Sequence, residues 1–516
     1  MRTLLLTALV ALSPIAARAA DCAALASLEL PDTTITSAVA TPGGTFTPPY
    51  GDPVGKLPAF CRVVGVLRPS SDSHILFEVW LPEKNWNKKF LGVGNGGFAG
   101  SIGYGGLAGN LRRGYATAGT DTGHQAEAED ASWAYQHPEK IADFGYRALH
   151  LTTDRAKTIT KAYYGSSPSK SYFDSCSDGG REALMEAQRF PEDYDGILAG
   201  APANNWTHML SAGIDVQHAV LADPAGYISS MKLPAITAAV LAACDSADGL
   251  KDGILNDPRQ CHFDPAAIQC KSEDALNCLT APQVAALRKI YSGGQDSHGT
   301  LIFPGLMPGD EAGTWKSWVT GSAPGGSNYI QNYFRYMVYD DPTWNGLTAS
   351  VDQAIAAADT RTAQQINSTD PDLGRFKARG GKLILYHGWN DPAISPLNTI
   401  AYYKSVQSAA GEEQASTFVS LYMVPGMGHC VGGPGPSAFG QFGIPSAKGE
   451  TYGIFTALEQ WVETGKRPAS IIATKYTADK KVEMTRPLCP YPQVAKYNGT
   501  GDQDDAASFS CTLPKE

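Results

Sequence analysis

The chain has 516 residues, which is long enough for an enzyme-sized core together with a second domain or a large insertion. Its 43% hydrophobic and 18% charged residues are ordinary for a globular protein and exclude an intrinsically disordered chain. The formal net charge of −10, without any Lys/Arg-rich stretch, argues against nucleic acid or an anionic membrane as a partner.

The first residues have the pattern of a secretory signal peptide. Arg2 supplies a short basic region, residues 4–12 are apolar, and Ala17-Arg18-Ala19 is a small-x-small cleavage site. The apolar run is well short of the roughly 20 residues that a membrane span needs. We therefore expect residues 1–19 to be removed, and we expect the mature protein to be secreted or periplasmic.

The first part of the mature chain alternates between strand-like and helix-like segments. Short apolar runs, several of which end in glycine-rich turns, are separated by stretches with apolar residues at helical spacing. The expected strands cover residues 89–94, 115–121, 171–174 and 195–200, and the expected helices cover 145–164 and 180–190. Alternation of this kind predicts an α/β parallel sheet with helices on both faces.

The alternation is interrupted by a long middle stretch that is rich in turns, clustered cysteines and aromatic residues. The strand pattern then resumes at residues 382–388 and 417–424. A domain-sized insertion that splits the core explains this order, and in a hydrolase such an insertion usually covers the active site. We predict an α/β-hydrolase core with a large inserted lid domain: the first part of the core at 20–204, the lid at 205–380, and the second part of the core at 381–516.

Ser177 is the candidate nucleophile, because it lies between an expected strand and an expected helix. Acyl transfer needs a hydroxyl on such a turn, and the usual pattern there is G-x-S-x-G. The pattern is only half met, since Ser175 stands where the first glycine belongs, although Gly179 and Gly180 still allow the helix to approach the strand closely. The alternative is a serine that merely caps a helix or forms a tight turn.

Two later segments could supply the remaining members of a Ser-His-Asp triad in the chain order of α/β-hydrolases. Asp391 follows the expected strand 382–388, and a carboxylate just beyond a strand is where the acid of the triad lies. His429 follows the strand 417–424 on a glycine-rich loop, from which it is free to reach the nucleophile. The alternatives are an Asp-Pro turn for Asp391 and, for the base, His387, which fits core packing better.

Ten cysteines in a chain expected in an oxidising compartment favour disulfides over a metal-thiolate site. Short loops suggest the pairs Cys244–Cys261, Cys270–Cys278 and Cys489–Cys511, which leave Cys22, Cys61, Cys176 and Cys430 to pair among themselves. Cys176 precedes the candidate nucleophile and Cys430 follows the candidate base. If the triad assembles, these two cysteines become neighbours, and a disulfide between them is natural.

An oxyanion hole needs two backbone N–H groups directed at the developing negative charge. Asp178, which follows the candidate nucleophile, is expected to supply one of them. The turn after the expected strand 89–94 is expected to supply the other, from Gly97 in preference to Gly96. The alternative is a plain glycine-rich turn.

An aspartate-rich loop within the insertion suits a hard cation, which prefers carboxylate and carbonyl oxygens. We expect a structural calcium ion here, although an acidic turn without metal is the alternative. The spacing differs from that of an EF-hand. The expected ligands are the side chains of Asp245, Asp248 and Asp252 and the carbonyl oxygens of Leu250 and Ile254.

As a set, these motifs resemble those of the tannase and feruloyl esterase family, whose hallmark is a Ser and a His that are each flanked by a disulfide-bonded cysteine. The resemblance covers essentially the whole mature chain, including residues 94–100, the aspartate-rich loop and residues 425–430. It implies an α/β-hydrolase core, a lid that carries calcium and no organic cofactor. It also implies five bridges: Cys22–Cys61, Cys176–Cys430, Cys244–Cys261, Cys270–Cys278 and Cys489–Cys511.

The resemblance further implies a substrate that is an ester of an aromatic acid, free or attached to a plant polysaccharide or polyphenol. We expect a feruloyl esterase first, and a tannase or an MHETase-like monoester hydrolase as alternatives. Such a substrate needs aromatic and apolar walls with a few polar groups. The lid residues that could provide them are Trp318, Phe334 and Arg335, together with Trp315 and Tyr336.

Two other readings use the same residues. The first is a secreted, calcium-stabilised protein that binds aromatic compounds or glycans with a catalytically dead hydrolase core. An intact set of Ser177, Asp391 and His429 with flanking cysteines argues against it, because binding alone does not need them. The second is a peptidase on the same fold, which only the family resemblance disfavours.

Overall fold

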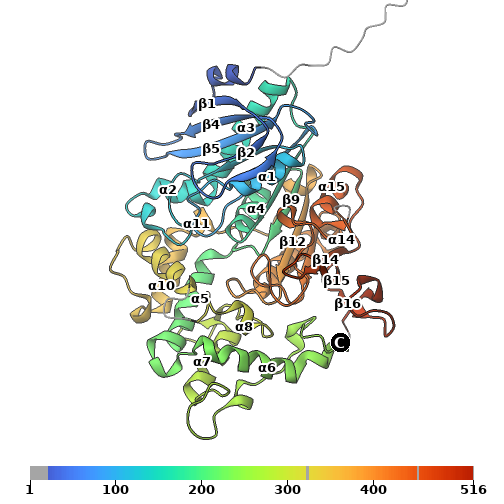
Figure 1. The fold of residues 1–516 in the computed structure, drawn as a ribbon. Coiled ribbons are helices and arrows are strands. Elements are labelled where there is room, and N and C mark those ends of the chain that lie inside the picture. The colour runs from blue at the N-terminus through green and yellow to red at the C-terminus, as the bar shows by residue number, and fades with distance from the viewer. Residues whose placement is uncertain (1–20, 321–324, 450–451, 515–516) are drawn as a thin grey trace, which may run out of the picture.

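The computed structural model describes residues 21–320, 325–449 and 452–514, so the expected signal peptide lies outside the described residues. The chain forms a core around one large sheet, and the residues of the insertion gather on one side of it (Figure 1). Smaller hairpins at the C-terminal end lie beside the core.

The main sheet has nine strands in the order β1-β4-β5-β7-β6-β8-β9-β12-β13. Its strands from β7 to β13 are parallel, as predicted, and they come from both parts of the core. The strands of the sheet are β1 (Thr33–Thr41), β4 (Phe60–Leu67), β5 (Ile75–Pro82), β6 (Lys89–Val93), β7 (Ala116–Thr120), β8 (Lys170–Cys176), β9 (Gly196–Gly200), β12 (Lys382–Gly388) and β13 (Val419–Val424).

Three antiparallel strands, β1, β4 and β5, extend the sheet at one edge and were not expected from the sequence. They lack the glycine-rich turns that mark the parallel strands. In β5 the pattern is also obscured by Glu78, a buried carboxylate that accepts hydrogen bonds from Trp80 Nε1 at 2.7 Å and from Tyr104 Oη at 2.9 Å. Buried acidic residues of this kind are rare in strands unless they are fully paired.

Helices cover both faces of the sheet. One face is buried against α3, α4 and α13, and the other against α15 and α1. The expected helix 145–164 begins as a π-helical turn at Asp143–Arg147 and continues as α3. The core helices are α1 (Tyr104–Arg112), α2 (Pro138–Ala142), α3 (Ala148–Tyr164), α4 (Asp178–Arg189), α12 (Gly374–Ala378), α13 (Pro396–Ala410), α14 (Glu412–Ser416) and α15 (Ile454–Thr464).

The insertion is mainly helical and has its own hydrophobic clusters. It contains α5 (Trp206–Gln217), a π-helical continuation (His218–Ala222), α6 (Leu233–Cys244), α7 (Ala281–Ser292), α8 (Glu311–Thr314), α9 (Gly325–Asn332), α10 (Val351–Arg361), α11 (Ala363–Ile366) and the short strands β10 (Gly294–Gln295) and β11 (Leu301–Phe303). Leu373 and Phe376 lie within the expected insertion but are buried in the core of the main sheet. The last residues before β12 therefore pack with the core.

One segment of the insertion, residues 224–248, is long and apolar enough by composition to cross a membrane, with a mean hydropathy of 1.4. Its α-helical part is α6, which has 12 residues, and short 3-10 turns make up the rest. Twelve residues rise about 18 Å, which is less than the roughly 30 Å of a bilayer core.

The C-terminal residues form hairpins that pack against the aspartate-rich loop. Leu250 of that loop is buried with Cys489 and Phe509. Asn256 Nδ2 donates to the carbonyl of Ala495 at 2.6 Å. In these hairpins β14 (Ile471–Tyr476) pairs with β15 (Val482–Leu488), and β16 (Val494–Tyr497) pairs with β17 (Phe509–Thr512). A separate hairpin near the N-terminus pairs β2 (Gly44–Phe46) with β3 (Val54–Leu57).

All ten cysteines are paired in the structure, and the pairs are those that the family resemblance implied. The five disulfides are Cys22–Cys61, Cys176–Cys430, Cys244–Cys261, Cys270–Cys278 and Cys489–Cys511.

Candidate active site

Ser177 lies on the sharp turn between β8 and α4. Its φ is 68°, in the left-handed region that residues other than glycine rarely adopt, and its N–H donates to the carbonyl of Gly200 at 3.0 Å. A Cβ at Gly180 would clash with that same carbonyl, so α4 approaches β9 this closely only because residue 180 is glycine. A strained serine between a strand and a helix is the geometry of a nucleophile elbow.

The serine at position 175, which breaks the usual elbow pattern, is accommodated by two glycines. A Cβ at Gly179 would clash with Ser175 Oγ, and a Cβ at Gly94 would lie 2.7 Å from it. The absence of these two side chains leaves room for the serine. The departure from G-x-S-x-G therefore does not distort the turn that carries Ser177.

Ser177, His429 and Asp391 form one hydrogen-bonded chain. His429 Nε2 lies 2.9 Å from Ser177 Oγ, and His429 Nδ1 lies 2.8 Å from Asp391 Oδ2. The three residues follow β8, β13 and β12, whose carboxyl ends lie at the same edge of the sheet. A serine hydroxyl in contact with an imidazole that a carboxylate orients is the arrangement used for acyl transfer.

Asp391 is fully buried and accepts four hydrogen bonds. Its Oδ1 accepts from the N–H groups of Ala393 at 2.8 Å and Ile394 at 3.0 Å, and its Oδ2 accepts from His429 and from His387 Nε2 at 3.1 Å. Burial alone would raise the pKa of Asp391, but the charge of His429 and the hydrogen bonds of both histidines lower it well below its usual range. The carboxylate is therefore ionised.

His387 lies at the end of β12, fully buried, and it contacts Asp391 rather than Ser177. Its Nε2 also lies 3.1 Å from the carbonyl of Ile394, so Nε2 has two acceptors and carries the proton. Its Nδ1 lies 2.8 Å from Thr399 Oγ1. Sequence reasoning assigned this histidine to packing, and the signal it missed was the four-residue spacing from Asp391.

The loops that carry Asp391 and His429 are held together by backbone hydrogen bonds. The N–H of Asn390 donates to the carbonyl of Met427 at 2.9 Å, and the N–H of Trp389 donates to the carbonyl of Val424 at 3.0 Å. The disulfide Cys176–Cys430, with a Cα–Cα distance of 6.1 Å, joins the residue before Ser177 to the residue after His429. Both connections fix the position of the imidazole relative to the serine.

Asp178 and Gly97 are the two residues expected to supply the oxyanion hole. Asp178 is the first residue of α4, so its N–H has no partner within the helix. Gly97 lines the same cavity as Ser177, and a Cβ there would lie 2.6 Å from Tyr329 Oη, whereas Gly96 faces open space. Of the two glycines considered from the sequence, Gly97 is therefore the one that shares a cavity with the serine.

The turn that contains Gly97 is held by a buried acid that sequence reasoning missed. Glu182 Oε2 accepts from the N–H of Asn95 at 2.9 Å. Burial, followed by the charge of Asp178, raises the pKa of Glu182 to about 8. Asp178 itself is paired with Arg181, whose side chain is fully buried and also donates to the carbonyl of Gly145 at 2.6 Å. These contacts order the first turn of α4.

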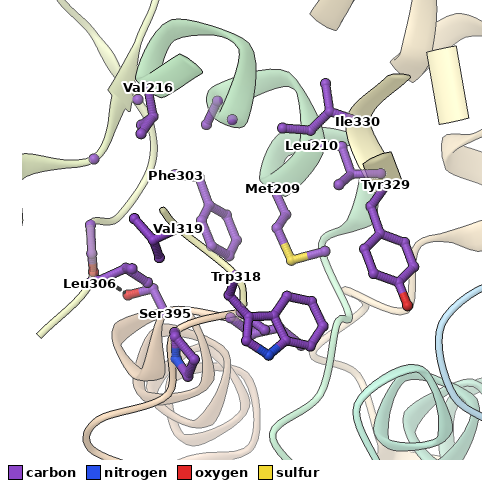
Figure 2. A pocket seen from close by; sticks show the side chains of 18 of the residues that line it. Met209, Leu210, Val216, Phe303, Leu306, Trp318, Val319, Tyr329, Ile330 and Ser395 are labelled. Atoms are coloured by element: carbon purple, nitrogen blue, oxygen red, sulfur yellow. Dashed lines mark hydrogen bonds between the residues drawn. The ribbon is translucent and has the colours of Figure 1, made fainter. Parts of the chain in front are cut away.

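A cavity of about 190 Å³ adjoins Ser177 and extends into the insertion. Among the described residues that line it none has a charged side chain, and most are apolar. Trp318 lies at the end near the serine, 5.5 Å from the ring of His429 and stacked on Tyr329 at 5.8 Å between ring centroids. Figure 2 shows both rings beside Met209, with Val216 and Leu306 farther along the cavity.

Phe334 and Arg335 are not among the described residues that line this cavity, so the structure does not support the contact with a substrate that the sequence suggested for them. Phe334 is fully buried and packs on Trp344 at 4.8 Å between ring centroids, and Arg335 Nε donates to the carbonyl of Trp344 at 2.8 Å. Trp315 is buried in another cluster of the lid, and Tyr336 packs against Tyr135. Trp318 is the only one of the lid candidates among the described residues that line the cavity.

The aspartate-rich loop lies beside the loop of His429. Asp248, Asp252, Leu250 and Ile254 line one small cavity together with Pro425, and Asp245 lies outside that lining, where it accepts from the N–H of Gly253 at 2.9 Å. Burial raises the pKa of Asp248, and the charges of Asp252 and Asp245 raise it further. Clustered, partly buried carboxylates with nearby carbonyls are a donor set that fits a hard cation.

The arrangement of the sheet and of the serine turn defines the class of protein. A mainly parallel, twisted sheet with a nucleophile elbow after one strand, and an acid and a histidine after two later strands, is an α/β-hydrolase fold.

Comparisons with known proteins specify this class further. The family model of tannase and feruloyl esterase matches residues 61–512. An uncharacterised esterase of Xanthomonas campestris is 45% identical over 98% of this chain and 93% of its own length. Feruloyl esterase B of Aspergillus niger is 33% identical over 87% of this chain and 86% of its own length.

Solved structures agree with this assignment. Feruloyl esterase B from Aspergillus oryzae has a TM-score of 0.89 at 32% identity, with 95% of this chain and 99% of that chain covered. Tannin acyl hydrolase from Aspergillus niger shares the fold, with a TM-score of 0.75 at 23% identity over 95% and 93% of the two chains. The chain belongs to the tannase and feruloyl esterase family, and it is a carboxylic ester hydrolase.

Proposed function

We propose that this protein is a secreted serine esterase that hydrolyses esters of aromatic acids, with Ser177, His429 and Asp391 as its catalytic triad. The observation that carries the proposal is the hydrogen-bonded chain from Asp391 through His429 to Ser177, with distances of 2.8 and 2.9 Å. These are the contacts that a general base needs to take a proton from a nucleophile.

The reaction proceeds through an acyl-enzyme. Ser177 Oγ attacks the ester carbonyl carbon while His429 Nε2 takes the hydroxyl proton, and Asp391 holds the imidazolium through Nδ1. The bond to the alcohol oxygen then breaks, and His429 returns the proton to the leaving alcohol. Water repeats the sequence, with His429 as base, and releases the acid and the free serine. The negative charge on the carbonyl oxygen is stabilised by the N–H groups of Gly97 and Asp178.

An aromatic acid suits the cavity beside Ser177, which has apolar walls and the stacked rings of Trp318 and Tyr329. We favour hydroxycinnamates, because two relatives that match most of this chain are named feruloyl esterase B. Gallate esters remain the second candidate. A terephthalate monoester is disfavoured, because none of the described residues that line the cavity carries a charge to pair with its carboxylate.

The test compares the wild type with Ser177→Ala on p-nitrophenyl acetate. We expect the wild type to release p-nitrophenol and the variant to lose about 10³-fold or more in rate. Equal rates would contradict the esterase proposal and favour a binding protein with a dead core. A panel of methyl ferulate, methyl gallate and mono(hydroxyethyl) terephthalate, ranked by kcat/KM, then identifies the acid.

We further propose that the aspartate-rich loop binds calcium through the side chains of Asp245, Asp248 and Asp252 and the carbonyl oxygens of Leu250 and Ile254. The small cavity that Asp248, Asp252, Leu250 and Ile254 line together supports this assignment. Bound calcium would neutralise the clustered carboxylates and so stabilise the loop. Five disulfides also support an extracellular or periplasmic location, because such bonds persist in oxidising compartments.

A further inference from the structure

The cavity beside Ser177 follows one face of α5 into the lid. Its lining residues on this helix and on the π-helical turn after it recur at intervals of three and four, which places them on a single face. They are Trp206, Met209, Leu210, Ala212, Gly213, Val216, Gln217, Val220 and Leu221. The cavity therefore has an elongated arm that leads away from the serine.

Gln217 is the exception on this apolar face. Only 6% of its surface is exposed, yet neither Oε1 nor Nε2 has a hydrogen-bond partner within the described part of the chain. A buried amide without partners is destabilising unless something else satisfies it. Another polar side chain of the arm, Ser395, is already engaged, because its hydroxyl donates to the carbonyl of Gly305 at 2.6 Å. Trp206 Nε1 also lacks a partner, but it is a single donor at the near end of α5.

The position of Gln217 sets the length of the group that could reach it. Trp206 and Gln217 mark the two ends of α5, and eleven residues of helix rise about 16 Å. Helical side chains lean toward the N-terminus, so the amide lies somewhat closer to Ser177 than its backbone does. A group bound by Gln217 must therefore lie at the far end of an extended ligand.

The acid part of the ester is the part that fits this arm. In the acyl-enzyme the acid is covalently held at Ser177 while the alcohol leaves, so the cavity that adjoins the serine suits the acid. The arm is lined by no charged residue within the described chain, and an amide both donates and accepts. These features select an apolar acid with an uncharged hydroxyl at its far end.

We propose that Gln217 is a specificity-determining residue that hydrogen-bonds the distal hydroxyl of an extended, uncharged hydroxyaryl acid. Hydroxycinnamoyl groups have this form, because the propenoyl spacer moves the ring hydroxyl away from the ester. In galloyl groups the ring is attached directly to the carbonyl, so their hydroxyls extend less far from the ester along the arm. This inference rests on the proposed esterase function of Ser177, and it narrows the substrate class of that site.

The experiment measures kcat/KM for two matched pairs of methyl esters: cinnamate with 4-hydroxycinnamate, and benzoate with 4-hydroxybenzoate. For the wild type we expect the hydroxyl to raise kcat/KM about tenfold or more in the cinnamate pair, because without it the buried amide stays unpaired. We expect a clearly smaller effect in the benzoate pair. Gln217→Leu should lower the cinnamate-pair ratio to about one.

Gln353→Leu is the matched control, because Gln353 is an exposed glutamine on the lid helix α10 and should keep the wild-type ratio. Thermal melting supplies a second readout. Replacing an unpaired buried amide by an apolar group should raise the melting temperature of the free enzyme. Gln217→Met, which keeps the side-chain length, serves if the leucine variant does not fold.

The possible failures are distinguishable. A wild type that hydrolyses none of the esters, with Ser177→Ala unchanged, overturns the proposed function. Hydrolysis of all four esters with the same cinnamate-pair ratio in the wild type and in both Gln217 variants overturns only the role of Gln217. A lowered melting temperature for both variants also contradicts it, because the amide would then have a structural partner.

Discussion

The carboxylate of Asp391 is shared between two histidines with different tasks. His429 connects it to Ser177, whereas His387 contacts Asp391 and Thr399 but not the serine. Both histidines bind the same oxygen, Oδ2, so His387 restricts where His429 can meet that oxygen. We infer that His387 is a positioning residue for the triad.

Replacing His387 by leucine removes one of the four donors to Asp391. We expect kcat to fall about tenfold while KM changes less, because the orientation of His429 matters more in the transition state than in the bound substrate. The conservative variant His387→Gln keeps an N–H donor and should recover part of the loss. Steady-state kinetics of the two variants test this, and a wild-type kcat for His387→Leu would show that the contact is only structural.

The ionisation of Glu182, which lies beside the turn that carries Gly97, makes the free energy of unfolding depend on pH. Its pKa is raised from 4.5 to about 8, so between these values the folded protein holds a proton that the unfolded chain releases. The contribution of Glu182 to the free energy of unfolding therefore falls as the pH rises from about 4.5 to 8, and it is constant above that window.

Glu182→Gln removes this titration while keeping a neutral hydrogen-bonding group. We expect the free energy of unfolding of the variant, relative to the wild type, to increase as the pH rises from 5 to 8. Urea denaturation at pH 5, 7 and 9 measures the difference directly. Other buried acids, such as Asp121 and Asp174, titrate in both proteins and cancel in the comparison. A constant difference across this range would contradict the raised pKa.

The aspartate-rich loop joins elements that are far apart in the sequence. Asp252 Oδ2 accepts from Arg486 Nη2 of β15 at 2.8 Å, and Ile254 lies against Gly426 of the loop that carries His429. The loop thus packs between the lid, the C-terminal hairpins and the loop of His429, although it is far from the proposed triad in the sequence. We infer that order in this loop supports the position of His429.

The calcium site proposed for this loop predicts that a chelator lowers both the melting temperature and the activity. We expect a chelator to lower the melting temperature of the wild type, and calcium to restore it, because ion binding stabilises only the folded loop. Asp248→Ala should melt at the lower temperature with or without chelator. Asp52→Ala, at an exposed site outside the loop, should respond as the wild type does. If the melting temperature of the wild type is the same with and without the chelator, the calcium assignment is wrong.

The two halves of the core are joined covalently beside the proposed triad. Cys176–Cys430 closes a loop of 254 residues that contains the whole lid, and a loop of this length restricts the unfolded chain strongly. The same bond fixes the distance between the turn of Ser177 and the loop of His429. Its effects on stability and on activity should therefore appear together.

The double variant Cys176→Ser/Cys430→Ser tests this coupling. We expect the free energy of unfolding to fall by about 2–5 kcal/mol and kcat to fall at least tenfold. The matched control is Cys270→Ser/Cys278→Ser, whose bond closes a loop of only 8 residues in the lid and should leave kcat near the wild-type value. Chemical denaturation and steady-state kinetics measure the two quantities, and equal kcat losses in both double variants would contradict a local role for Cys176–Cys430.

The features that could be predicted from the sequence are those that show in a short run of residues or in the order of residues along the chain. Buried parallel strands give continuous apolar runs, so β6, β8, β9, β12 and β13 were expected within a few residues of their observed bounds. Chain order indicated Ser177, Asp391 and His429, which the structure brings together. The antiparallel strands β1, β4 and β5 were missed, because their pairing is not marked by glycine-rich turns.

The interior of the lid could not be predicted, because it depends on packing between distant segments. From the sequence, Phe334 and Arg335 were expected to contact a substrate. In the structure Phe334 packs on Trp344 instead. Gln217, in contrast, is an ordinary polar residue near the end of a helix when only the sequence is known. Its burial depends on the packing of residues 290–306 across α5, which cannot be read from the sequence.

The long separation between Cys176 and Cys430 has a consequence for biosynthesis. At roughly 5–20 residues per second, their sequence separation of 254 means that Cys430 emerges from a ribosome about 13–50 s after Cys176. During that interval four other cysteines appear, all of which pair within the lid: Cys244, Cys261, Cys270 and Cys278. Cys176 must stay unpaired or be released from wrong partners until synthesis is nearly finished. The yield of active enzyme should thus depend on thiol–disulfide isomerases in the host cell.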